Sequence, residues 1–124
     1  MLGFGVGNSW SQDFSAAVFY GANPPWDELK SFNVVVVEPE HGFNPEEHRT
    51  STSELFAYVS LGEVLPSRAY AQDIPGAWII GENKAWKSMI VDQTQDEWAK
   101  FVLTNIVDPL WRQGYRGFFL DTLD

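Results

Sequence analysis

The chain of 124 residues contains no cysteine. Disulfide bonds, thiolate metal sites and a cysteine nucleophile are therefore excluded. Basic residues are also scarce, because 8 lysines and arginines stand against 17 aspartates and glutamates, for a formal net charge of −9. This balance argues against nucleic acid and against an anionic membrane surface as partners, since phosphate groups require a basic protein face. It is compatible with a cationic ligand, although the charge alone favours the simpler interpretation of an ordinary acidic surface.

Long apolar runs are absent as well. No segment approaches the roughly 18 residues that a membrane span needs, so we expect no membrane insertion. The first seven residues are apolar but lack a basic start and are too short for a signal peptide. Core material is plentiful, because 44% of the residues are hydrophobic and 15% are aromatic. That amount suits one domain or part of one.

Four apolar runs are typical of buried strands. The clearest is Val34–Val37, because four consecutive β-branched residues disfavour a helix and suit a strand that is buried on both faces. A further strand-like run covers residues 88–92, after a long connection over residues 64–87 that is expected to be functional or to hold small elements of its own. The four predicted core strands span residues 16–20, 33–37, 55–60 and 117–121.

Helical segments separate these strands. One begins near Pro24 and another near Asn44, each with proline and acidic residues in its first turn. A longer helix is predicted to begin at a capping box made by Thr94 and Glu97 and to end at a glycine. Pro109 lies within that helix and is expected to kink or divide it.

The order of these elements predicts an α/β fold. Strands that alternate with helices require right-handed crossovers and form a mostly parallel sheet. A small open sheet is one solution, and the first half of an eight-stranded barrel is the other. We expect the N-terminal half of a (β/α)8 TIM barrel over residues 16–124, truncated after its fourth strand, because no covering helix follows the last strand. Residues 1–15 are predicted to be a flexible lead.

Acidic residues recur where the predicted strands end. In a parallel sheet these ends lie on one rim, so their carboxylates would converge in one cleft. Acids after strands also serve as helix caps or turn residues, and any one of these acids taken alone could have such a structural role. A group of them suits glycoside hydrolysis, which requires paired carboxylates. The residues are Glu38, Glu63, Asp92, Asp121 and Asp124.

Aromatic residues are expected near the same rim, where a sugar ring could stack on them through its C–H face. Trp98 and Trp111 fall on the capped helix and are expected to serve packing instead. The predicted rim aromatics are Tyr20, Trp26, Tyr58, Trp78 and Trp86.

Other chemistries find little support. His41 and His48 lie seven positions apart without the spacing of a metal motif, so neither a metal nor another cofactor is expected. No serine lies in a G-x-S-x-G elbow, which makes a serine hydrolase a poor fit.

Several motifs in this order resemble glycoside hydrolase family 114. They are Ala57–Glu63 (AYVSLGE), the pair Val91-Asp92, and Gly114–Asp121 (GYRGFFLD). The segments Val18–Gly21 and Gly81–Asn83 add a similarity to hydrolase domains of bacterial Pel exopolysaccharide biosynthesis. The resemblance covers about residues 16–124.

The resemblance implies a (β/α)8 barrel enzyme that cleaves inside chains of α-1,4-linked galactosamine or N-acetylgalactosamine. The family's acid at the end of the fourth strand falls on Asp121, and its catalytic glutamate would lie in the barrel's second half. A cationic polysaccharide and exopolysaccharide secretion machinery are the implied partners, and the implied location is periplasmic or extracellular. The residues expected to contact substrate are Tyr20, Glu38, Tyr58, Glu63, Asp92 and Asp124.

Two other functions remain open from the residues alone. A non-catalytic carbohydrate-binding module could use the same acidic and aromatic rim. A small response-regulator-like signalling domain is the weaker alternative, because its strand-end acids, Ser/Thr and Lys are not in the expected order.

Overall fold

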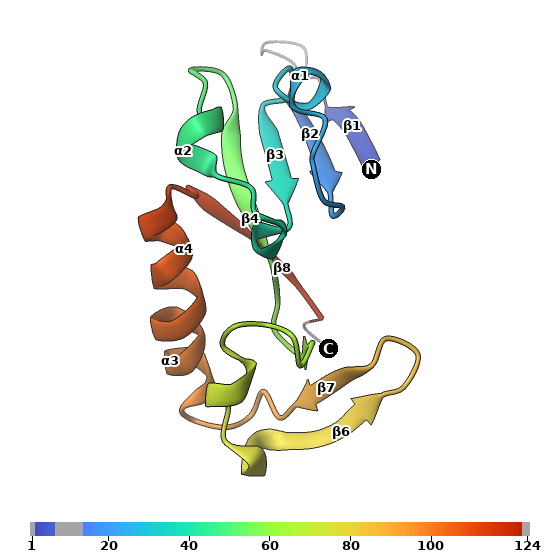
Figure 1. Ribbon diagram of the computed structural model, residues 1–124, viewed down its shortest axis with the longest axis vertical. Helices are drawn as coiled ribbons and strands as arrows, with labels where there is room; N and C mark the ends of the chain where they lie inside the picture. The colour runs from blue at the N-terminus through green and yellow to red at the C-terminus, as the bar shows by residue number, and fades with distance from the viewer. Residues whose placement is uncertain (1, 7–13, 123–124) are drawn as a thin grey trace. The chain divides into compact units, whose positions relative to one another are not determined.

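The four valines of β3 (Val34–Val37) form the best-buried strand of the chain (Figure 1). In this computed structural model, which describes residues 2–6 and 14–122, Val35 and Val37 are fully buried and Val36 is 3% exposed. Neighbouring residues of a strand point to opposite faces, so β3 is covered on both sides, as its sequence predicts. Each buried valine contributes about 1.5–3 kcal/mol relative to an exposed one.

The central sheet has the strand order β1-β2-β3-β4-β8. Strands β2 (Phe14–Phe19), β3 and β4 (Glu54–Ser60) pair in parallel. β8 (Gly117–Asp121) runs parallel to β4, because Arg116 N–H donates to the Leu55 carbonyl and Leu61 N–H to the Asp121 carbonyl, each at 2.9 Å. The four predicted parallel strands are therefore confirmed, and with them the α/β fold class.

The chain divides into two compact units, which are described separately below. The first unit comprises the chain up to Tyr58 together with Leu110–Phe119. The second comprises Val59–Pro109 together with the chain from Leu120. Strands β4 and β8 each contribute residues to both units.

The core of the first unit lies on one face of the sheet. Alternate residues of β2, β3 and β4 supply it, joined by side chains from the segments that follow the strands. Two short helices follow β2 and β3, namely α1 (Trp26–Leu29) and α2 (Pro45–His48), and both have acids in the first turn. The core residues are Ala17, Leu29, Val35, Val37, Phe43, Leu55, Ala57 and Tyr115.

The second unit carries a small antiparallel sheet with the order β5-β7-β6. The strands are β5 (Glu63–Val64), β6 (Ile79–Asn83) and β7 (Ser88–Val91), so the connection over residues 64–87 does hold elements of its own. The second unit also contains two short 3-10 turns, η2 (Ala71–Asp73) and η3 (Gly76–Trp78), and a third, η1 (Pro39–His41), belongs to the first unit.

The long helix begins later than predicted, but it ends as predicted, at Gly114, which has a φ of 117°. It begins with α3 (Trp98–Val102), so the capping box at Thr94 and Glu97 is wrong. A π-helical turn, η4 (Leu103–Val107), then leads into α4 (Asp108–Gln113). Pro109 lacks the N–H that a continuous helix needs, and the wider turn before it divides the helix as predicted. No helix in the described part of the chain is long and apolar enough to cross a membrane.

The predicted flexible lead is wrong for residues 2–6, which form β1 (Leu2–Val6). This strand pairs antiparallel with β2, from Leu2 opposite Val18 to Val6 opposite Phe14. Its apolar residues alternate with glycines, and that period of two is too short a run to stand out in a sequence. The pairing covers the edge of β2 that faces away from β3.

Gly117 tests how tightly β8 packs against β4. A Cβ at this position would lie against the Phe56 ring, 2.6 Å from Cδ1. We expect Gly117→Ala to destabilise the protein by about 1–3 kcal/mol in urea unfolding, because the ring has to move. Gly76→Ala is the control, since no atom lies within 4 Å of its added methyl group. Equal stability of the two variants would contradict this packing.

Candidate functional site

Asp121 is the last residue of β8, and its side chain is exposed. Its carboxylate Oδ1 accepts the N–H of Thr122 at 2.8 Å. Its main-chain carbonyl accepts the N–H of Leu61, the residue that follows β4, at 2.9 Å. The carboxylate is therefore presented to solvent on a backbone that its neighbouring strand holds in place.

Thr122, directly after Asp121, has a φ of 57°. A β-branched residue rarely adopts this left-handed conformation, which costs of order 1–3 kcal/mol. Three contacts hold it: Gly62 N–H donates to its hydroxyl at 2.8 Å, the Ser60 hydroxyl lies 2.7 Å from that oxygen, and Gln93 Nε2 donates to its carbonyl at 3.2 Å. The backbone beyond Asp121 is thus fixed by side chains and backbone from two other segments.

Gly62 is required by this close approach. A Cβ at position 62 would collide with the Thr122 carbonyl oxygen and lie 2.6 Å from Gln93 Nε2. Glycine lets the chain after β4 pass close to the chain after β8, where any side chain would force them apart.

Glu63 is bound within the second unit. Its Oε1 accepts the Asn83 amide at 2.9 Å and the Ser88 hydroxyl at 2.7 Å. Ser88 is buried, and both partners belong to the β6–β7 hairpin. This arrangement ties the hairpin to the end of β4, so Glu63 supports the surroundings of Asp121.

Asp92 caps a turn. Its Oδ1 accepts the backbone N–H of Thr94 at 3.0 Å and the Thr94 hydroxyl at 2.5 Å, and its Oδ2 accepts the Gln95 amide at 3.1 Å. The hydrogen bonds from Thr94, and then that from Gln95, lower the pKa of Asp92. Asp92 is therefore a turn residue, the alternative that the sequence left open for each strand-end acid.

Glu38 lies in the first unit and is buried, with 7% exposure. Its Oε2 accepts the Glu40 N–H at 2.8 Å and so caps η1. Burial, and then the charge of Glu38, raise the pKa of Tyr115, whose fully buried hydroxyl has no hydrogen-bond partner among the described residues. Glu38 therefore has a structural task.

Two of the predicted rim aromatics form a pair in the first unit. The rings of Tyr20 and Tyr58 meet edge to face with centroids 4.9 Å apart. Phe119 stacks beyond Tyr58 at 6.3 Å. Tyr20 is 47% exposed, so this cluster offers an aromatic surface next to the carboxyl end of β2.

The three predicted rim tryptophans have different surroundings. Trp26 packs against Phe43 and His48, at 5.9 and 5.4 Å between centroids. Trp78 packs edge to face on Trp98 at 6.2 Å. Both tryptophans therefore serve packing, which corrects their assignment to a sugar-binding rim. Trp86 alone of the three is largely exposed, at 74%.

His48 also serves packing. Its ring stacks on Phe43 at 4.4 Å, and its Nδ1 lies 2.8 Å from the Asn44 carbonyl. Within residues 2–6 and 14–122, the structure contains no group of three or more histidines and acids that could hold a metal ion.

The structure thus brings Asp121 together with Ser60, Gly62 and Thr122. Asp124 lies outside the described residues. Glu38 and Tyr20 belong to one unit and Asp121 to the other, so a single rim of five acids stays a prediction. Sequence reasoning missed Ser60, Thr122 and Gln93. The sequence pattern that could have indicated them is a hydroxyl or amide side chain within two positions of a strand-end acid or glycine.

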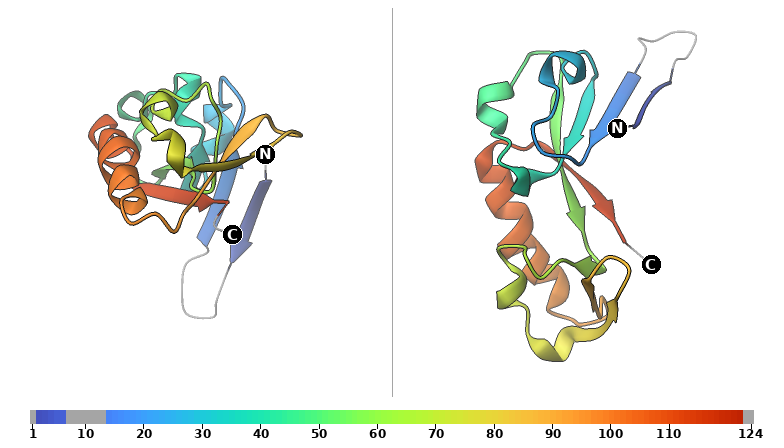
Figure 2. Two further views of the ribbon diagram at one scale, coloured as in Figure 1. Left: turned by 90° about the horizontal axis from the view of Figure 1, so that it is seen from below. Right: turned by 45° about the vertical axis from the view of Figure 1, so that its right-hand side comes forward.

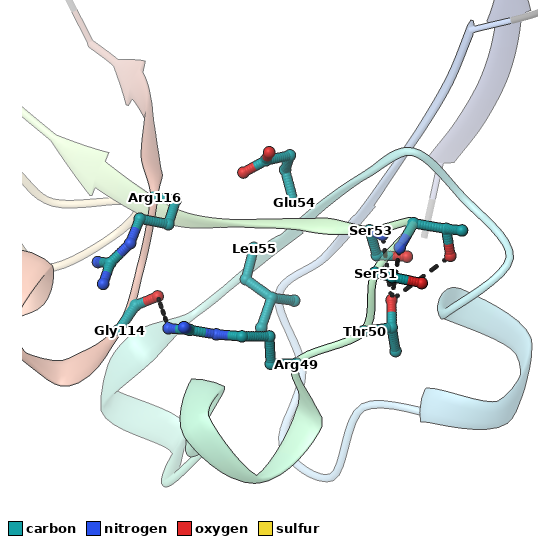
Figure 3. Close-up of a pocket in the computed structure, with 9 residues that line it drawn as sticks. Arg49, Thr50, Ser51, Ser53, Glu54, Leu55, Gly114 and Arg116 are labelled. Atoms are coloured by element: carbon teal, nitrogen blue, oxygen red, sulfur yellow. Dashed lines mark hydrogen bonds between the residues drawn. The ribbon is translucent and has the colours of Figure 1, made fainter.

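A pocket of about 250 Å³ lies in the first unit, where β4 and β8 begin (Figure 3). Arg49, Glu54 and Arg116 are among its lining residues. Arg49 donates to Glu46 at 2.9 Å, and Arg116 donates to the Tyr115 carbonyl at 2.8 Å. Catalytic groups of parallel α/β folds lie past the opposite ends of the strands, so this pocket is not the active site.

Asp92 provides a pH test. Its folded-state pKa is lowered, so it stabilises the fold above its ordinary pKa of 3.8, and this contribution is lost as the pH falls through the lower folded value. We expect the wild type to be more stable than Asp92→Asn at about pH 6. The difference should shrink progressively below pH 3.8.

The measurement is chemical unfolding of both proteins across this range. Asp96→Asn is the matched control, because it removes the same charge from an exposed side chain that makes no hydrogen bond to a described residue. A pH-independent difference between wild type and Asp92→Asn would contradict the assignment.

Comparison with known proteins identifies the family. The chain matches glycoside-hydrolase family GH114 over residues 3–124. It is similar to the solved glycoside hydrolase domain of PelA from Pseudomonas aeruginosa, with 34% identity and a TM-score of 0.70, over 88% of this chain and 44% of that one. A variant of that domain matches at 33% identity and a TM-score of 0.69, with the same coverage. No curated protein matches the chain. The chain, which spans less than half of the PelA domain, belongs to glycoside hydrolase family 114.

Proposed function

We propose that the chain is part of an endo-acting glycoside hydrolase that cleaves α-1,4-linked galactosamine and N-acetylgalactosamine in a Pel-like exopolysaccharide. The observation that supports this most is the presentation of Asp121. Its carboxylate stands at the end of a parallel strand, and the hydrogen bonds of Leu61 and Thr122 restrict its backbone. Membership of GH114 supplies the reaction class.

Asp121 serves as one of two catalytic carboxylates. Glycoside hydrolysis requires one group to protonate the leaving oxygen and another to attack the sugar or activate water. The two groups lie about 5–5.5 Å apart in retaining enzymes and about 6.5–9.5 Å apart in inverting ones. The second carboxylate belongs to the part of the barrel that these 124 residues do not cover, so the chain by itself is inactive.

The substrate is a cationic polysaccharide, which a protein with a net charge of −9 attracts over long range. Tyr20 and Tyr58 offer aromatic faces to the sugar rings. Glu63, Asp92 and Asp124 contact or surround the polymer, whereas the buried Glu38 supports the fold.

The biological setting follows from such a substrate. An exopolysaccharide and its secretion machinery are located in the periplasm or outside the cell. The enzyme would act there, in biofilm matrix biosynthesis.

Asp121→Asn tests the catalytic assignment in the complete barrel enzyme. The amide is nearly isosteric and still accepts the Thr122 N–H, so the fold is retained while the acid function is lost. We expect release of oligosaccharides from a galactosamine polymer to fall by about 10²–10⁴-fold. Unchanged release by the folded variant would remove Asp121 from the mechanism, and robust release by the 124-residue chain alone would show that it holds a complete site.

Glu63→Gln is expected to be milder. The glutamine oxygen can still accept from Asn83 and Ser88, with hydrogen bonds about half as strong as those to a carboxylate. We expect turnover to stay within about tenfold of wild type, because the hairpin keeps its attachment. A loss as large as that of Asp121→Asn would instead place Glu63 in the chemistry.

A non-catalytic carbohydrate-binding module is the second candidate, favoured by the exposed Tyr20 and its contact with the half-buried Tyr58. It predicts that the protein binds the polymer and that Asp121→Asn changes neither binding nor any measured release.

A further inference from the structure

The turn between β6 and β7 presents the most exposed large hydrophobic side chain of the described residues. Trp86 is 74% exposed, and its indole takes part in no ring contact or hydrogen bond with any described residue. The turn extends away from α3, which belongs to the same unit (Figures 1 and 2). An exposed indole has a face that a ligand can stack on, and the surroundings of Trp86 indicate which ligand fits.

The turn is held in one conformation. Asn83 Oδ1 accepts the N–H of Ala85 at 3.1 Å and that of Trp86 at 3.4 Å. Lys87 adopts the left-handed region, with a φ of 55°, and Asn83 pairs with Ser88 across the hairpin. Trp86 is therefore displayed on an ordered turn, and little entropy is lost when a ligand contacts it.

The turn is also connected to the end of β4. The Asn83 amide donates to Glu63, and Glu63 lies one residue after Gly62, which bonds to Thr122 beside Asp121. The hairpin belongs to the segment that leaves the carboxyl end of β4, where parallel α/β enzymes place their substrate loops. All of these residues lie in the second unit.

Two lysines flank Trp86 in the turn. Lys84 and Lys87 are two of the four lysines in a chain of net charge −9, and neither forms an ion pair with a described residue. Glu82, on β6, only partly offsets them. Both lysines lie within two positions of Trp86, so their charges act on a ligand that contacts the indole.

We propose that Trp86 forms a sugar-binding site, separate from Asp121, that prefers N-acetylgalactosamine units to galactosamine units of the polymer. The proposal rests on the proposed function. Sugar C–H groups, made electropositive by the ring oxygens, stack on the electron-rich face of the indole. Lys84 and Lys87 repel a sugar ammonium group but tolerate a neutral acetamido group. The acidic remainder of the protein attracts the amino groups of the polymer. The Trp86 site then holds the acetylated stretches of that polymer.

The test measures binding of this chain to two probes, an N-acetylgalactosamine oligomer and the same oligomer after de-N-acetylation, by calorimetry at low salt. We expect Trp86→Ala to weaken binding of the acetylated oligomer by about tenfold, and Trp86→Phe to retain most of it. Trp111→Ala is the matched control, since Trp111 is also exposed, at 49%, but lies against the Arg116 guanidinium at 4.4 Å. It should leave binding unchanged.

The lysines are tested by the double variant Lys84→Gln with Lys87→Gln. We expect it to raise affinity for the de-N-acetylated oligomer by roughly threefold to tenfold at low salt and to leave the acetylated one unchanged. The gain should disappear at about 1 M salt, where the Debye length is about 3 Å. A purely structural role of the turn would not produce this salt-dependent difference between the two probes.

Separate outcomes overturn the site and the proposed function. If Trp86→Ala binds both oligomers as the wild type does, while Asp121→Asn abolishes hydrolysis in the complete enzyme, the site falls and the function stands. If the chain binds neither oligomer and the complete enzyme releases nothing, both fall. Binding of anionic phosphatidylserine vesicles that Trp86→Ala abolishes, without any oligomer binding, would assign the turn to a membrane surface and overturn the sugar site.

Discussion

Parallel pairing along β4 is the constraint on which the site depends. β4 lies between β3 and β8, so the ends of three successive parallel strands point the same way. The residues that leave β4 therefore meet the residues that leave β8, and Leu61 bonds directly to the backbone of Asp121. An antiparallel partner would have brought the beginning of one strand to the end of the other. The valines of β3 maintain this arrangement, since burial on both faces leaves them no other position in the sheet.

Hydrogen bonds beyond the strands complete what the sheet begins. Thr122 occupies a backbone conformation that its β-carbon disfavours, and contacts from Ser60, Gly62 and Gln93 offset the cost. Such strain is characteristic of sites where a side chain has to be aimed. In this chain it falls on the residue next to the exposed acid, which restricts the directions that the carboxylate of Asp121 can take.

The acids at the strand ends have different tasks because their surroundings differ. Glu38 and Asp92 accept backbone N–H groups and serve as caps. Glu63 accepts two side chains of a hairpin and joins it to β4. Asp121 is exposed at the end of its strand, which suits a group that meets substrate. One sequence pattern, an acid after an apolar run, therefore covers structural support and candidate chemistry alike.

The sequence by itself determined the four parallel strands, the α/β class and the position of Asp121, because runs of valine, helix-starting prolines and strand-end acids act through neighbours in the chain. Only the tertiary structure decided that Trp26 and Trp78 are packed while Trp86 is exposed, and that Glu63 binds Asn83 and Ser88. It also decided where the long helix begins, since residues 92–95 form a turn that Asp92 caps and the helix starts only at Trp98. Most of these outcomes depend on groups that folding brings together from distant segments, and no local pattern in the sequence records which groups meet.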